Sequence, residues 1–386
     1  MAAEKHLVIG LMSGTSVDAV DAALIETDGE GHVRGLAAAD RPYTDAERSL
    51  IRQAAAHALT LPAPTDDPLI AQAERILTLA HAEAIAALPG SDQATLIGFH
   101  GQTIAHRPPS YFKSIASGSH QSIASGSGHS IASGSGHANP YTWQIGNASL
   151  LAQLTGRPVV HDFRSADVAA GGEGAPLAPG YHRALVSGLA LPVGILNLGG
   201  VGNLTWFDES GNWGAFDTGP GNGLIDDWVQ QHSGARYDAD GALAGAGQVH
   251  DDVLTAMADI AFFDQAGPKS LDRADFSIAP ARGLSAADGA ATLTAFTAET
   301  VALSLRNVPV VLNRLLVTGG GRRNPVLMRM IADRTGLPTQ PVESEGWHGD
   351  ALEAQAFAWL AVRHLRGLPL SWPETTGVPA PQTGGQ

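Results

Sequence analysis

The stretch VGILNLGGVGNLTWFDESGNWGAFD, residues 193–217, decides the fold. Its apolar runs predict three strands, over Val193–Leu198, Gly202–Phe207 and Trp213–Asp217. A Gly-Gly turn separates the first two strands and a Ser-Gly turn separates the last two, which is typical of consecutive hairpins. Helical patterns follow, so the stretch indicates an α/β unit.

The same order of elements opens the chain. Strands are predicted over Leu7–Met12 and Ala19–Glu26, and a third follows a hairpin at Asp28-Gly29. Helical patterns come next, over Asp45–Leu59 and Leu69–Leu88. The repetition predicts a duplicated α/β fold with a ligand between the halves. The alternative is that the two hairpin sets are unrelated, since any α/β protein can contain such pairs.

At 386 residues the chain is long for a single hydrophobic core, which favours two domains. We expect an N-terminal domain over 1–160, onto which a helix at about 350–366 packs back, and a C-terminal domain over 161–349. The tail over 371–386 is rich in Pro, Thr and Gly and is expected to be poorly ordered at its end. A Ser/Gly/His repeat over 114–137 predicts a flexible surface loop, without the rigid element that a metal site needs.

The composition narrows the classes of function. A net charge of −15 and the lack of any Lys/Arg cluster argue against a nucleic-acid partner. An acidic protein that binds a polyanion such as ATP must place positive groups locally, from backbone N–H groups, a few Lys or Arg, and Mg²⁺. There is no cysteine, which excludes disulfides and thiol catalysis. We expect a cytoplasmic protein without a membrane partner, because neither a signal peptide nor an apolar run of about 18 residues is present.

Two glycine-rich turns, one over Ser13–Ser16 and one over Asn197–Asn203, predict a site for nucleotide phosphates. Turns between apolar strands let backbone N–H groups approach phosphate oxygens, since glycine has no Cβ. A third turn precedes a helix that Asn324 is predicted to cap, with Pro325 as its first residue. Such a helix N-terminus can meet an anion or a ribose. The residues expected to contact ATP are Ser13, Gly14, Thr15, Ser16, Asp18, Asn197, Gly199, Gly200, Asn203, Gly319, Gly320 and Asn324.

Asp217 is the candidate catalytic residue. It comes at the predicted end of a strand, before a turn dense in Gly and Pro. There its carboxylate could take a proton from an attacking hydroxyl or water. The alternative, equally weighted from the local pattern, is an Asp that caps the next helix. Asp350 and Glu353 sit three apart on a helical pattern, which fits either substrate binding or helix capping.

Several motifs together resemble the anhydro-N-acetylmuramic acid kinase family, in that family's order and over nearly the whole chain, from residue 9 to about 365. The motifs are Met12-Ser-Gly-Thr-Ser-Val-Asp18, His100-Gly-Gln-Thr103, His106-Arg-Pro108, Gln144-Ile-Gly146, Asp162-Phe-Arg164, Gly172-Glu-Gly-Ala-Pro-Leu177, Asn197-Leu-Gly-Gly200, Asp217-Thr-Gly-Pro-Gly-Asn222, Pro268-Lys-Ser270, Gly319-Gly-Gly-Arg-Arg-Asn324 and Asp350-Ala-Leu-Glu-Ala354.

The resemblance implies a duplicated ribonuclease H-like fold of the actin, hexokinase and heat-shock chaperone ATPase type, with a central cleft. It implies that ATP and water convert 1,6-anhydro-N-acetylmuramic acid to N-acetylmuramic acid 6-phosphate and ADP in peptidoglycan recycling. Asp217 would be the general base, acting on water, and Asp18 is the candidate Mg²⁺ ligand. A homodimer is also implied. The expected sugar contacts are His100, Gln102, Asp162, Arg164, Gly221, Asn222 and Glu353.

Three departures from the family pattern stand out. Ala19 occupies a position where the family usually has Gly, and the 114–137 repeat is inserted. The segment Pro268-Lys-Ser-Leu-Asp-Arg-Ala274 keeps Lys269, Ser270 and Arg273 of the family's PKSTGRE pattern but has Ala in place of its final acid. One alternative function is another kinase of this fold with a different acceptor. The other is an actin- or chaperone-like ATPase that binds a partner, which predicts slow ATP hydrolysis without an acceptor.

Overall fold

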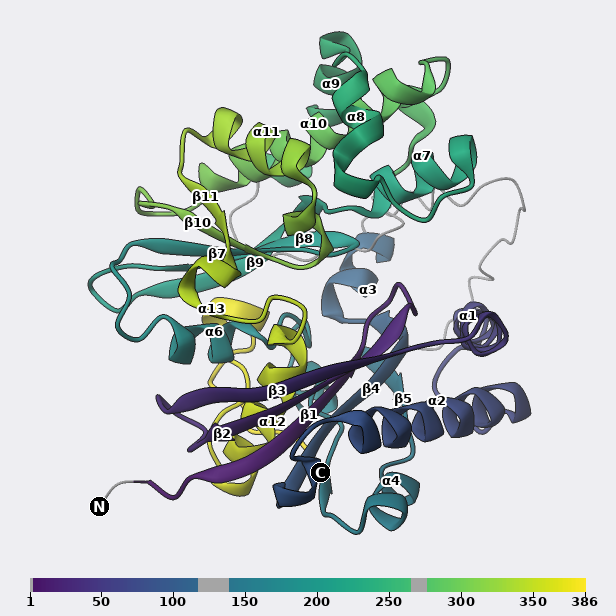
Figure 1. Cartoon of the computed structure of the whole chain (residues 1–386), viewed down its shortest axis with the longest axis vertical. Coiled ribbons are helices and arrows are strands. Elements are labelled where there is room, and N and C mark those ends of the chain that lie inside the picture. Colours follow the sequence, from purple (N-terminus) through teal and green to yellow (C-terminus); the bar gives the residue numbers. More distant parts are fainter. Residues whose placement is uncertain (1–2, 117–138, 265–275) are drawn as a thin grey trace. The chain divides into compact units, whose positions relative to one another are not determined.

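A computed structural model describes residues 3–116, 139–264 and 276–386 (Figure 1). These residues form two compact units. The first comprises the described residues up to Ser187 together with Ala351–Gln386, and the second comprises those of Gly188–Asp350. Residues 117–137 of the Ser/Gly/His repeat and the altered segment 268–274 lie outside the described residues, so the expectations for them stay predictions.

The first unit is built on a sheet in the order β3-β2-β1-β4-β5, with β6 also paired to β4. The strands are β1 (His6–Ser13), β2 (Ala19–Thr27), β3 (Val33–Pro42), β4 (Leu96–Arg107), β5 (Tyr141–Ile145) and β6 (Val159–Val160). The first three strands are antiparallel neighbours, while β4 runs parallel to β1 and β6 runs parallel to β4. The predicted hairpins therefore form as expected.

The sequence supplies side-chain caps for the two helices that follow the first hairpins. The helices of the first unit are α1 (Asp45–Ala58), α2 (Pro68–Ala87), α3 (Pro109–Ala116), α4 (Ala148–Thr155), α5 (Ser165–Ala169), α6 (Pro179–Leu185), α12 (Leu352–Leu365) and α13 (Pro373–Thr376). Thr44 and Glu47 form a capping box at the start of α1, and Asp67 caps α2 ahead of Pro68. Both long helices predicted after the first hairpins are confirmed.

Alternation along β1 decides which helix covers which face of the sheet. Ile9 and Leu11 belong to the core that includes Leu77 of α2. Gly10 points to the opposite face, where a Cβ on it would lie 1.7 Å from the backbone oxygen of Ala354 in α12. A Cβ on Gly98, the register partner of Gly10 on β4, would lie 2.1 Å from the backbone oxygen of Phe357 in the same helix. Two facing glycines thus let α12 lie directly on the sheet.

The first unit ends later than residue 160, where we expected the division. Tyr181 of α6 donates a hydrogen bond of 2.7 Å to Gln355 of α12. Asp167 of α5 accepts hydrogen bonds from Thr376, at 2.7 Å, and from Ser371. These contacts tie α5 and α6 to the C-terminal segment and hence to the first unit.

The C-terminal tail is packed, contrary to the expectation of poor order. The backbone of Gln386 exchanges hydrogen bonds with that of His161, at 2.9 and 3.1 Å. Ser371 and Gln382 form an isolated antiparallel bridge. Proline and glycine in the tail serve turns between these contacts, so composition alone was misleading.

The second unit repeats the plan of the first. Its sheet has the order β11-β10-β7-β8-β9, formed by β7 (Val193–Leu198), β8 (Val201–Phe207), β9 (Trp213–Pro220), β10 (Leu315–Thr318) and β11 (Thr339–Pro341). β7, β8 and β9 are antiparallel neighbours, and β10 and β11 run parallel to β7. Strand order and direction match those of the β3-β2-β1-β4-β6 set, which confirms the duplicated ribonuclease H-like fold.

Helices α10 and α11 cover one face of this second sheet. The helices of the unit are α7 (Gly223–Ser233), α8 (Ala242–Ala246), α9 (Asp251–Ala258), α10 (Ala286–Leu305) and α11 (Pro325–Thr335). Leu196, Leu204 and Phe216 are register neighbours across the sheet, and they share a buried core with residues of both helices. Within the described ranges, none of the helices has the length and apolar content needed to cross a membrane.

Buried histidines make the stability of the first unit sensitive to acid. His81 in α2 donates from Nδ1 to the Leu77 oxygen at 2.8 Å and packs edge-on against Phe99. Burial lowers the pKa of His81 to about 4, and that of His182 to about 4 as well. The unfolded chain binds these protons near pH 6.5, so the free energy of unfolding should fall as the pH drops from 6.5 towards 4.

We therefore expect urea unfolding at pH 4.5 to give a smaller free energy than at pH 7.5, with about 1.4 kcal/mol lost per unit of pKa depression that is titrated. His81→Leu removes one such group and should flatten the dependence on pH. An unchanged slope in this variant would contradict the role of His81.

Candidate active site

Four polar side chains form a row across the second sheet. Asn197 on β7 lies opposite Asn203 on β8, Asn203 lies opposite Asp217 on β9, and Thr318 on β10 lies beside Asn197. Residues in register point to the same face of a sheet. Leu196, Leu204 and Phe216 point to the opposite face, towards α10 and α11. The row therefore lies on the face away from these helices.

Asp217 lies inside a strand and not at its end, which corrects the predicted boundary. β9 continues to Pro220, because Val201 and Gly202 of β8 still pair with it. The register shifts there, so that Thr218 is the extra residue of a β-bulge directly after Asp217. Bulges re-aim neighbouring side chains and are frequent beside active sites.

The capping interpretation of Asp217 is wrong. The N-cap residue of α7 is Asn222, five positions further along the chain. Asp217 instead lies half-buried in the ladder beside Asn203. Its carboxylate therefore lies on the face of the sheet away from α10 and α11.

The turn after β7 and the segment after β9 are locked together. The Asn222 backbone N–H donates to the Gly199 oxygen at 2.7 Å, and its side-chain amide donates to the Leu198 oxygen at 2.8 Å. The Gly221 N–H donates to the Gly200 oxygen at 3.1 Å. A Cβ on Gly221 would lie 2.2 Å from the Gly199 oxygen, so only glycine allows this approach.

The third glycine turn joins the same place. A Cβ on Gly319, whose φ is +76°, would lie 2.5 Å from the Asn197 side-chain oxygen. One on Gly321 would lie 2.6 Å from Leu198. The turn after β7, the segment after β9 and the Gly319–Gly321 turn thus lie side by side with glycine at each contact. Glycine-rich backbone of this kind can bind nucleotide phosphates.

Asn324 caps α11 as predicted. Its side-chain oxygen accepts from the N–H groups of Val326 and Leu327, at 3.0 and 3.1 Å, and Pro325 opens the helix. The side chain is buried and committed to the cap. If this segment contacts ATP, we therefore expect the contact to come from the N-terminus of α11 and not from the Asn324 side chain.

The sequence suggested that Asp350 and Glu353 share a helix face, but they do not. α12 begins at Leu352, after Asp350. The Asp350 carboxylate instead pairs with Arg322 at 2.8 Å and with Arg323. Arg322 also donates to the Gly319 oxygen at 2.9 Å, so this ion pair steadies the third glycine turn.

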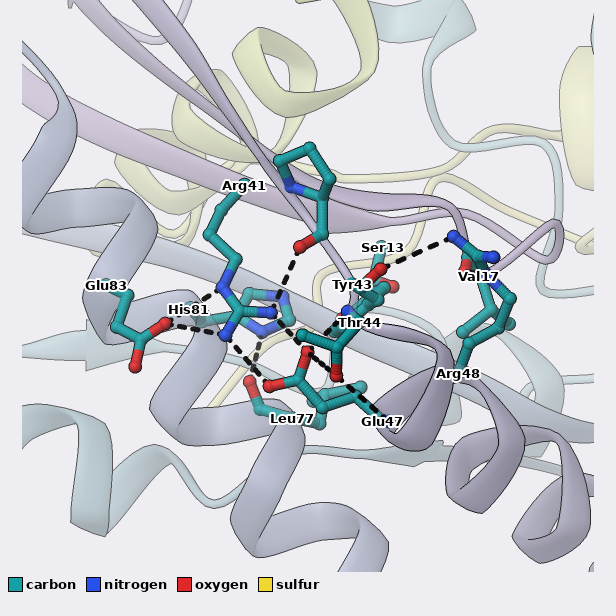
Figure 2. Close-up of polar contacts among 11 residues, drawn as sticks. Ser13, Val17, Arg41, Tyr43, Thr44, Glu47, Arg48, Leu77, His81 and Glu83 are labelled. Atoms are coloured by element: carbon teal, nitrogen blue, oxygen red, sulfur yellow. Dashed lines mark hydrogen bonds and ion pairs between the residues drawn. The ribbon is translucent and has the colours of Figure 1, made fainter.

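In the first unit, the turn after β1 is held by two arginines of α1. Arg48 donates to the Val17 oxygen at 3.0 Å, as Figure 2 shows, and Arg52 donates to the Ser16 oxygen at 2.9 Å. Val17 has a φ of +55°, which is strained for a β-branched residue. Strain of this kind persists where surrounding contacts enforce it, and the two arginines supply such contacts. The sequence analysis missed both arginines.

Side chains of the first turn divide into two groups. Thr15, Ser16 and Asp18 are exposed. The Ser13 side chain is buried, and its hydroxyl donates to Gln102 at 2.6 Å. The same hydroxyl accepts from Tyr43 at 3.0 Å, and Figure 2 labels both of these residues. The Gln102 amide donates in turn to the Thr103 oxygen. The geometry gives Ser13 and Gln102 the role of joining β1 to β4 beneath the turn.

Two residues expected to contact sugar, His100 and Glu353, lie near a third, Arg164. The Arg164 guanidinium donates to His100 Nε2 at 3.0 Å and to the Gly174 oxygen at 2.8 Å. Burial lowers the pKa of His100 well below 6.5, so the imidazole is neutral and can accept this bond. Burial also lowers the pKa of Arg164 to about 10, against the opposing effect of Glu353. His100, Arg164 and Glu353 are thus electrostatically linked.

Asp162 and Asp167 shape the loop that carries Arg164. Asp162 has a φ of +51° and accepts from the Ser165 N–H at 3.3 Å and from the Gln386 side chain at 2.9 Å. Asp167, which the sequence analysis missed, accepts from the Gly174 N–H at 2.7 Å. Because Asp167 also binds the C-terminal segment, it fixes the Gly-rich loop Gly172–Leu177 in place.

A magnesium site cannot be recognised from protein ligands alone. Across 3–116, 139–264 and 276–386, no three His, Asp or Glu side chains cluster as ligands for a metal ion. Mg²⁺ usually binds through one or two carboxylates together with substrate phosphates. Asp18, exposed on the first turn, fits that pattern and stays the proposed ligand.

Comparison with known proteins agrees with this architecture. A family model described as anhydro-N-acetylmuramic acid kinase matches residues 6–133 and 113–386. A protein of that name from Rhizorhabdus wittichii is 54% identical over 99% of this chain and 98% of its own length. Namesakes from Zymomonas mobilis and Paramagnetospirillum magneticum are 48% and 50% identical, each over 98% of this chain and 99% of the relative. The chain therefore belongs to the anhydro-N-acetylmuramic acid kinase family.

Proposed function

We propose that the protein uses ATP and water to convert 1,6-anhydro-N-acetylmuramic acid to N-acetylmuramic acid 6-phosphate and ADP. The observation that carries the proposal is the alignment of Asp217 with Asn203 and Asn197, beside three interlocked glycine turns. The proposed reaction couples the attack of water to phosphoryl transfer. It needs an acid–base group close to backbone N–H groups that can bind phosphates. The identity of the sugar in this proposal comes from membership of the family.

In the proposed reaction the Asp217 carboxylate takes a proton from a water molecule that attacks the anomeric carbon. The bond between that carbon and O6 breaks, and O6 leaves with the electron pair. O6 then attacks the γ-phosphorus, and the bond from that phosphorus to ADP breaks. General base catalysis of this kind typically contributes ~10²–10⁴-fold.

Backbone N–H groups of the glycine turns would hold the phosphates, and Arg322 would keep the third turn in place. Bound Mg²⁺, held by the phosphates and by Asp18, would supply positive charge against the charge that develops on the phosphoryl group. Around Arg164, the linked side chains His100 and Glu353 would orient the sugar. Because His100 is neutral, its Nε2 can accept from Arg164 and hold that guanidinium in place.

The test is incubation with Mg-ATP and the anhydro sugar. We expect one ADP per sugar consumed, and a product whose mass exceeds that of the substrate by one water and one phosphoryl group. ADP release with other sugars but not with this one would favour a kinase of different specificity. ADP release at the same rate with and without any acceptor would favour the partner-binding ATPase. Neither of these two outcomes is compatible with the proposal.

The proposed setting is peptidoglycan recycling in the cytoplasm, with the protein acting as a homodimer. Support for these features comes from family membership.

A further inference from the structure

One face of α10 carries hydroxyl groups directed at the strand that bears Asp217. Thr297, Thr300 and Ser304 follow one another at intervals of three and four, which places them on one side of the helix. All three are fully buried. A buried stripe of hydroxyls in a helix otherwise rich in Ala and Leu calls for polar partners.

Two of these hydroxyls have partners outside their own helix. Thr297 donates to the Gly221 oxygen at 2.8 Å, and Ser304 donates to the Thr218 oxygen at 3.1 Å. Buried Ser and Thr in helices commonly bond instead to the carbonyl one turn back, as Thr292 does with the Asp288 oxygen. The bonds that Thr297 and Ser304 make to backbone outside α10 therefore lie on the side of this helix that meets β9.

The two carbonyls that accept these bonds lie shortly after Asp217 in the chain. Thr218 is the bulge residue directly after Asp217, and Gly221 belongs to the segment locked onto the turn after β7. Between them, Gly219 has a φ of +148° and approaches α10 so closely that a Cβ would lie 2.5 Å from the Thr300 hydroxyl. Helix α10 thus grips the backbone on the C-terminal side of Asp217 at two points.

We propose that Thr297 and Ser304 are positioning residues that fix the direction of the Asp217 carboxylate by holding the bulged backbone behind it. The proposal rests on the proposed role of Asp217 as general base. Small errors in the placement of a catalytic group are costly, since a displacement of about 1 Å can lower turnover by about 10²-fold.

The chain offers a matched control in the same helix. Thr294 is as fully buried as Thr297, but among the described residues its hydroxyl has no hydrogen-bond partner. Thr294→Val and Thr297→Val therefore make the same chemical change, and only the second removes a bond to the segment after Asp217.

The experiment compares Thr297→Val, Ser304→Ala and Thr294→Val in the full-length protein. We expect the first two to lower kcat by about tenfold to 100-fold, with KM for ATP within about twofold of the wild-type value. Thr294→Val should keep wild-type kinetics. Thr297→Ser, which retains the hydroxyl, should restore turnover even if Thr297→Val folds poorly.

A second measurement does not depend on catalysis. Hydrogen exchange of the backbone amides in 217–222 should accelerate in Thr297→Val and not in Thr294→Val. Equal exchange in both variants, wild-type kcat in Thr297→Val, or a loss of kcat that only follows the folded fraction would each overturn the inference. If Asp217→Asn keeps full turnover in the same assay, the role of Asp217 fails instead, whatever the exchange data show.

Discussion

We expect Asp217→Asn to abolish turnover while the protein stays folded and still binds ATP. The amide has nearly the shape of the carboxylate but cannot take a proton from water. We expect kcat to fall by at least ~10²–10⁴-fold, the usual contribution of a general base. Because Asp217 is only half-buried, the loss of its charge should leave the melting temperature nearly unchanged. The measurements are steady-state kinetics, thermal unfolding and ATP binding by calorimetry.

Asp227→Asn is the matched control for this prediction. Asp227 is exposed on α7, ten residues along the same segment, and the substitution changes the net charge equally. It should turn over at the wild-type rate. If Asp217→Asn also did so, Asp217 would have no part in the chemistry.

The second large effect is on stability, at the contact between β1 and α12. Gly10→Ala places a methyl group where the Ala354 oxygen stands 1.7 Å away and the Ala358 nitrogen 2.8 Å away. Both obstacles are backbone atoms, so the helix must move off the sheet as a whole. We expect a loss of about 3 kcal/mol or more in the free energy of unfolding, at the upper end of overpacking effects. Urea unfolding of the full chain would measure it.

Gly31→Ala controls for the general effect of replacing glycine. A Cβ on Gly31 would have nothing within 4 Å, and its backbone conformation is an ordinary one. This variant should be neutral or slightly more stable, because alanine reduces the freedom of the unfolded chain. A Gly10→Ala protein as stable as Gly31→Ala would show that α12 does not lie as close to β1 as described.

Much of the fold could be predicted because its determinants are local. The strand over Val193–Leu198, the hairpin at Asp28-Gly29 and the cap at Asn324 each depend on residues within a few positions of one another. The end of β9 was missed for an opposite reason. Gly and Pro after Asp217 suggest a turn, yet pairing with Val201 and Gly202 extends the ladder through a bulge.

The candidate site could be predicted only as far as its backbone. Glycine turns are visible in the sequence, but their convergence depends on contacts such as Asn222 to Leu198. Asp167 gave no local pattern, because two of its partners, Ser371 and Thr376, lie some 200 residues away in the sequence. Arg48 likewise resembles any helix-surface arginine until its bond to the Val17 oxygen is known.

The position of α12 on the first sheet has a consequence for the order in which the protein can fold during translation. About 250 residues separate the end of β4 from the start of α12, which at roughly 5–20 residues per second amounts to about 10–50 s of synthesis. Until then, the face of β1 and β4 that carries Gly10 and Gly98 lacks its covering helix. The second unit has all of its strands within one continuous stretch that ends before α12. It can therefore complete its sheet before the first unit receives its covering helix. A nascent chain thus carries an uncovered sheet face while it finishes its second half, and a chaperone that shields this face in that interval should favour the native product.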